Sequence, residues 1–94
     1  MNTSLRSGRP ERKPGVWVRR AGDEIVVYDP TTEDINVLNS SALAIWELCD
    51  GKTLPEEMVA AVVDLSGLHP DIISEDVERI LTEFDKKGLL EWKP

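Results

Sequence analysis

The sequence predicts an α+β domain of winged helix-turn-helix character, with a three-stranded antiparallel sheet, then three helices and a short extended C-terminus. Two observations favour this fold. β-branched and aromatic residues gather in residues 16–19, 25–28 and Asp34–Leu38, with turn residues between them. From residue 40 onward, apolar residues instead recur at helical spacing. A chain of 94 residues is long enough for one small domain with a modest core.

Two short segments with turn chemistry join the three β runs. Ala-Gly-Asp at residues 21–23 suits the first reversal, and Asp-Pro-Thr-Thr at residues 29–32 suits the second. Proline presets one turn angle, while Asp and Thr side chains bond to the local backbone. Links this short favour an antiparallel meander. In a meander the third run, about residues 33–38, lies at an edge of the sheet.

Each helical segment shows an apolar stripe between recognisable ends. Asn39 and the two serines after it can cap the first helix, and Gly51 ends it. After a break at residues 69–70, Ser74 is expected to cap the third helix, which ends at Gly88. The stripes comprise Ala42, Ile45, Trp46 and Cys49 in the first helix, Leu54, Met58, Ala61, Val62 and Leu65 in the second, and Ile73, Val77, Ile80, Leu81 and Phe84 in the third.

Composition separates a basic start from the rest of the chain. Residues 1–15 are rich in Gly, Pro, Ser and basic side chains, so we expect a flexible tail there and a folded domain over residues 16–94. No secretory signal pattern follows the basic residues, and no apolar run approaches the ~20 residues that cross a bilayer. We therefore expect a cytoplasmic protein without membrane contact.

Charge is distributed unevenly along the chain. Six of the 11 basic residues lie within the first 20 residues, yet the net charge of the whole chain is −7. The remainder is therefore strongly acidic and repels a phosphate backbone. Nucleic acid is not an expected partner of the folded body.

The sequence shows no catalytic or metal-binding constellation. Cys49 is the single cysteine and lies on an apolar stripe, where we expect a small buried hydrophobe rather than a nucleophile. His69 has no nucleophile near it in sequence and is expected to be a solvated loop residue. The carboxylates gather near helix starts and lack the ligand pattern of a calcium loop. We expect no catalysis, no metal and no cofactor.

The third β run is the candidate for function. An edge strand leaves its backbone groups unpaired on one side, and Asp34–Leu38 contains no proline or lysine to discourage pairing. One flank of the third helix carries Asp76, Ile80, Glu83 and Lys87 at offsets 0, 4, 7 and 11. If this flank packs beside the edge, a peptide can add a strand there while the helix contacts its side chains. The alternative is an edge that simply faces water.

Short motifs spread over about residues 16–92 carry a family resemblance. In chain order they are Val37-Leu38-Asn39, Ala42, Ile45-Trp46, Asp50-Gly51, Pro55-Glu56-Glu57, Asp76-Val77, Ile80-Leu81 and Lys87-Gly88-Leu89-Leu90. Together they resemble the PqqD-like family of peptide chaperones, also called RiPP recognition elements after the ribosomally synthesised, post-translationally modified peptides that they serve. The Asp-Ile-Asn sequence at residues 34–36 departs from the Gly-aromatic start that this strand often has in the family.

The resemblance implies a non-catalytic protein that binds the leader segment of a precursor peptide as an added strand. It would deliver the precursor to a modifying enzyme, such as a radical SAM enzyme, a leader peptidase or a cyclodehydratase, and act as a monomer or weak homodimer. Carried onto this chain, the peptide-binding residues are Glu33, Asp34, Ile35, Asn36, Val37 and Leu38 of the strand, and Asp76, Val77, Ile80, Glu83, Phe84 and Lys87 of the helix.

Two other classes of function fit the predicted fold. A winged helix suggests a DNA-binding regulator, although the third helix carries five acidic and three basic residues between residues 74 and 87, a poor balance for a DNA groove. An exposed edge could also pair with its own copy, which would make the protein an edge-strand homodimerisation module. Duplex affinity and its salt dependence test the first class, and concentration-dependent mass tests the second.

Overall fold

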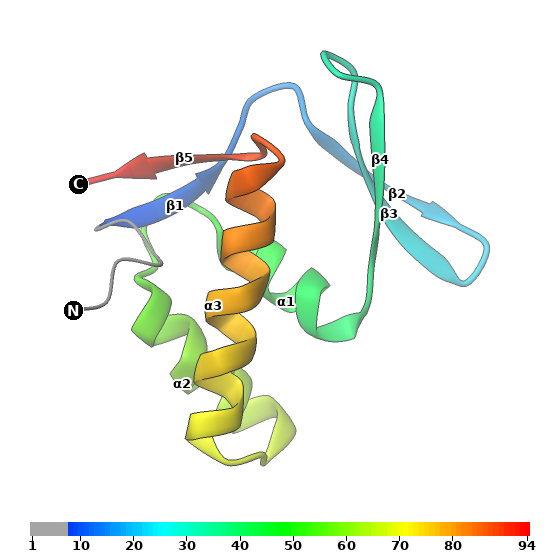
Figure 1. Cartoon of the computed structure of the whole chain (residues 1–94). Coiled ribbons are helices and arrows are strands. Elements are labelled where there is room, and N and C mark those ends of the chain that lie inside the picture. The colour runs from blue at the N-terminus through cyan, green and yellow to red at the C-terminus, as the bar shows by residue number, and fades with distance from the viewer. Residues whose placement is uncertain (1–7) are drawn as a thin grey trace.

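The computed structural model describes residues 8–94 and has the predicted α+β architecture (Figure 1). Its three helices pack together, with a three-stranded sheet on one side and a two-stranded ribbon across one end. The elements in chain order are β1 (Arg9–Arg12), β2 (Trp17–Ala21), β3 (Glu24–Asp29), β4 (Asp34–Leu38), α1 (Ser40–Leu48), α2 (Pro55–Ser66), α3 (Pro70–Lys86) and β5 (Leu90–Lys93).

The three predicted strands form an antiparallel meander with the order β2-β3-β4. In its register Val27 lies opposite Asn36, and Ile25 lies opposite Leu38. Because side chains alternate along a strand, these residues share the face that meets the helices. Ile35 and Val37 belong to the other face and are 66% and 58% exposed. Strand β4 therefore lies at an edge, as predicted, and turns one face toward the helices.

The core lies between the helices and the inner face of the sheet. Asn39 caps α1, since its Oδ1 accepts a 2.8 Å hydrogen bond from the backbone N–H of Ala42. The ring of Trp46 on α1 meets that of Phe84 on α3 edge-to-face, with centroids 5.2 Å apart. The buried apolar residues are Val27, Leu38, Ile45, Trp46, Cys49, Met58, Val62, Ile73, Val77, Ile80, Leu81, Phe84, Leu89 and Leu90.

The prediction of a flexible tail over residues 1–15 is wrong for residues 9–12, which form β1. This strand pairs antiparallel with β5, and the Pro10 side chain is fully buried. The Arg12 guanidinium Nη1 also donates 2.9 Å hydrogen bonds to the carbonyls of Trp46 and Glu47, where α1 ends. A folded domain that starts at residue 16 would omit these contacts. The part of the predicted tail formed by residues 1–7 lies outside the described residues.

Helix α3 begins five residues earlier than predicted. His69, rather than Ser74, is the N-cap: its Nδ1 accepts a 3.1 Å hydrogen bond from the backbone N–H of Asp71. Pro70 follows at the first helical position. The N–H group at this position has no partner within a helix, so proline loses no hydrogen bond there, and its fixed φ suits the helix. The apparent break is therefore the start of the helix, and Ser74 lies within it.

Within residues 8–94, none of the helices has the length and apolar character required to span a bilayer.

Candidate functional site

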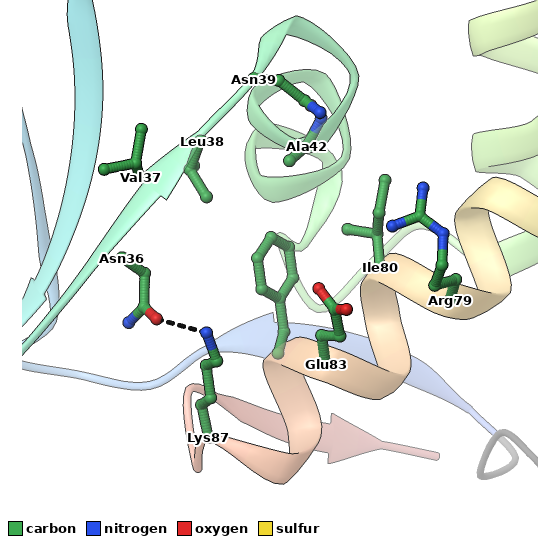
Figure 2. A pocket seen from close by; sticks show the side chains of 10 residues that line it. Asn36, Val37, Leu38, Asn39, Ala42, Arg79, Ile80, Glu83 and Lys87 are labelled. Atoms are coloured by element: carbon green, nitrogen blue, oxygen red, sulfur yellow. Dashed lines mark hydrogen bonds between the residues drawn. The ribbon is translucent and has the colours of Figure 1, made fainter.

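A groove runs between the edge strand β4 and helix α3 (Figure 2). Its volume of about 110 Å³ is well below the ~300 Å³ at which small-molecule sites begin, so it suits individual side chains better than an enclosed ligand. The ten residues that line it are Asn36, Val37, Leu38, Asn39, Ala42, Arg79, Ile80, Glu83, Phe84 and Lys87.

One wall of the groove is the backbone of β4. Among the described residues this strand pairs with β3 alone, so the N–H and C=O groups on its other side have no strand partner. Antiparallel pairing directs these groups outward at alternate residues. The wall can therefore form main-chain hydrogen bonds with a further extended segment.

The opposite wall is a charged row on α3. Arg79 and Glu83 on α3 and Lys87 at its C-cap follow one another at steps of four, which places them on one side of the helix. Lys87 reaches across the groove, and its Nζ donates a 2.6 Å hydrogen bond to Asn36 Oδ1 on β4 (Figure 2). Toward the other end of the groove, Arg79 and Ile80 lie near the start of α1.

The floor of the groove is apolar. Leu38 and Ile80 are buried, and Phe84 is 5% exposed and is held from behind by its ring contact with Trp46. Ala42 adds a small side chain from the first turn of α1. A polar rim over an apolar floor is the composition of sites that bind side chains of a partner.

Seven of the twelve predicted site residues line the groove, and five do not. Val77 is 1% exposed and belongs to the core, so its side chain is closed to a peptide. Asp76 pairs with Arg79 at 3.2 Å and does not reach the groove. Glu33 lies in the β3–β4 turn, and Asp34 and Ile35 are exposed residues at the start of β4, outside the groove.

Sequence reasoning missed Asn39, Ala42 and Arg79, which also line the groove. Arg79 left one signal in the sequence, because Arg79, Glu83 and Lys87 form a row at steps of four, but this spacing does not show that the row faces β4. Asn39 was predicted as the cap of the first helix and Ala42 as part of its apolar stripe. That both residues also line the groove depends on where α1 begins relative to β4.

Cys49 is fully buried, as predicted. Burial raises the pKa of its thiol to about 12, although the nearby Arg12 charge acts in the opposite direction. The thiol is therefore protonated near neutral pH and is a poor nucleophile. Among the described residues, no group of three or more His, Cys, Asp or Glu side chains could hold a metal ion.

The sequence profile of the family described as coenzyme PQQ synthesis protein D (PqqD) matches residues 24–90. The chain belongs to the PqqD family. The match spans β3, β4, all three helices and the start of β5, and so contains both walls of the groove. The resemblance inferred from the sequence motifs is thus confirmed. No protein with a curated description matches the chain.

Three solved structures share the PqqD-like fold of this chain. TbiB1 in complex with the TbiA(beta) leader peptide is 25% identical; the alignment covers 86% of this chain and 94% of that chain, with a TM-score of 0.75. The PqqD truncation of Methylobacterium extorquens PqqCD, described as a functional and stand-alone RiPP recognition element, is also 25% identical, with coverages of 94% and 96% and a TM-score of 0.76. Lasso peptide synthetase B1 complexed with the leader peptide is 14% identical and shows the fold alone, with coverages of 89% and 99% and a TM-score of 0.78.

Proposed function

We propose that this PqqD-family protein binds the leader segment of a ribosomally synthesised precursor peptide and delivers the precursor to a modifying enzyme. The observation that carries the proposal is the open edge of β4 beside a groove lined by α3. The leader adds a fourth strand to the sheet at this edge. Its side chains on the inner face then meet α3, and the main-chain bonds supply affinity that is independent of sequence.

The family match and the similar solved structures support this proposal. Two similar structures hold leader peptides, and a third is described as a stand-alone recognition element. Seven of the residues expected to bind the peptide line the groove. The partner is a peptide-modifying enzyme, such as a radical SAM enzyme or a leader peptidase, which performs the chemistry while this chain supplies binding. A cytoplasmic location suits a protein that meets its precursor soon after translation.

A DNA-binding role is less well supported. Acidic residues outnumber basic ones on α3, and one of the acids, Glu83, lines the groove. A helix of this charge is repelled by the phosphates that flank a DNA groove. Absence of duplex binding even at low salt would remove this candidate, whereas a steep loss of affinity with added salt would support it.

Calorimetric titration with the leader of a short precursor encoded beside this protein tests the proposal. We expect 1:1 binding with a dissociation constant on the order of micromolar or tighter, about −8 kcal/mol. A scrambled leader of the same composition is the control. Equal affinity for the leader and the scrambled peptide, or no binding of either, would contradict the proposal.

A further inference from the structure

The charged residues along the groove alternate in sign. Arg79, Glu83 and Lys87 follow one another along α3 as positive, negative and positive, and all three line the groove. Four residues of an α-helix advance ~6.0 Å, so the three charges form an evenly spaced row. Lys87 lies opposite Asn36 on β4, and Arg79 lies toward the end where α1 begins (Figure 2).

These charges are largely available to a guest. Within residues 8–94, Glu83 makes no side-chain hydrogen bond or ion pair, although a Glu four residues before a Lys commonly forms one. Lys87 instead contacts the neutral amide of Asn36. Arg79 pairs with Asp76, but both side chains are substantially exposed, and such pairs contribute little to stability.

An added strand has a matching repeat. Its residues advance ~3.3–3.4 Å each, so every second side chain recurs at ~6.6–6.8 Å, close to the spacing of the charged row. Alternate residues of an added strand share the face of Asn36 and Leu38 and point toward α3. Three successive side chains on this face can therefore meet the three charges in turn.

We infer that the groove selects leader segments with the pattern acid–X–base–X–acid. This inference rests on the proposed function and specifies its substrate class. The outer acids meet Arg79 and Lys87, and the central base meets Glu83. The central residue is Lys or Arg, whose long aliphatic stem covers the apolar floor formed by Ile80 and Phe84 while its charged head reaches the rim.

The sign pattern reads the same from either end. A guest strand therefore satisfies it whether it runs parallel or antiparallel to β4. The X residues lie on the outer face of the sheet, beside the exposed side chains of Ile35 and Val37. Apolar, β-branched residues fit there.

Three peptides with the frame Ser-Thr-core-Thr-Ser test the inference by calorimetric titration with the full chain. The cores are Glu-Val-Lys-Val-Glu, the charge-reversed Lys-Val-Glu-Val-Lys and the neutral Gln-Val-Gln-Val-Gln. We expect the first to bind at least about tenfold more tightly than the reversed peptide, with the neutral one between them, because exposed ion pairs are individually worth a factor of a few. The preference is expected to shrink at high salt.

The variant Glu83→Lys should transfer the preference from Glu-Val-Lys-Val-Glu to a fourth peptide, Glu-Val-Glu-Val-Glu in the same frame, which keeps the outer acids and places an acid opposite the new lysine. Glu75→Lys is the matched control, because Glu75 is an exposed acid on α3 that does not line the groove. It should leave the order of affinities unchanged. Equal binding of the three peptides, no binding of any of them, or an unchanged preference in Glu83→Lys would overturn the inference. The proposed function is judged separately by titration of the natural leader.

Discussion

Lys87, the C-cap residue of α3, donates a 2.6 Å hydrogen bond across the groove to Asn36 on β4. The two residues are 51 positions apart in sequence, so this contact links the C-terminal end of the helix to the edge strand. The other polar atom of the same amide, Asn36 Nδ2, is buried without a hydrogen-bond partner among the described residues. The pairing sets one end of the groove while the backbone edge beside it stays open.

Proline substitution in β4 should weaken leader binding by at least about tenfold, or ~1.4 kcal/mol. Adjacent residues of a strand direct their N–H groups to opposite sides. One of the two variants, Asn36→Pro or Val37→Pro, therefore removes an N–H that is open to the leader, and the other removes an N–H that bonds to β3. Calorimetry measures affinity, and circular dichroism checks that the helices remain. Val18→Pro in β2, on the opposite edge, is the control. If both β4 variants keep wild-type affinity, strand addition at this edge is wrong.

Glu33→Gly should stabilise the protein by about 0.5–1 kcal/mol. Glu33 has a φ of 63° and is the sole non-glycine residue with positive φ among residues 8–94. A side chain is strained in this conformation, and glycine is not. Urea denaturation measures the change. Thr32→Gly, at a neighbouring position without positive φ, should instead destabilise; a loss of stability in Glu33→Gly would argue against strain in this turn.

Arg12→Gln should lower the free energy of unfolding by about 1–2 kcal/mol, because its charged donor holds two carbonyls at the end of α1. Arg9→Gln is the matched control in the same strand. Arg9 donates a single exposed bond, of 3.2 Å, to the carbonyl of Pro94, and its loss should cost less than about 0.5 kcal/mol. Equal urea midpoints for the two variants would show that the hydrogen bonds of Arg12 to the end of α1 do not stabilise the protein.

Cys49 should resist a thiol reagent in the folded protein at pH 8 and react fully in denaturant. Burial raises the pKa of this thiol to about 12, so the reactive thiolate is scarce at that pH. Its position in the core also blocks the reagent. The colour released by an aromatic disulfide reagent follows the reaction. Rapid labelling of the native protein would contradict the buried position of this residue.

Local sequence signals predicted the elements that are determined by their own turn residues, caps and apolar spacing. The meander, the edge position of β4 and the apolar stripe of α3 followed from turn residues and spacing. Strand β1 did not, because Arg-Pro-Glu-Arg carries no β-type pattern and its pairing depends on Leu90–Lys93 at the far end of the chain. The early start of α3 was missed because His69 is an uncommon cap.

The groove was predicted in outline but not in its orientation. The spacing of α3 identified Ile80, Glu83 and Lys87, yet it also suggested Asp76, which lies outside the groove. Spacing alone cannot decide which flank of an apolar stripe faces the sheet, because the packing of α3 against α1 and α2 sets the rotation of the helix. This rotation places Arg79 in the groove and Asp76 outside it.

The most direct test of strand addition at β4 is an amide chemical-shift titration of the labelled protein with the natural leader. We expect the largest shifts at the backbone amides of residues 34–38, together with side chains of α3, and intermolecular contacts between the leader backbone and β4. Shifts confined to residues 8–15, or to the face of the sheet away from the groove, would contradict the account.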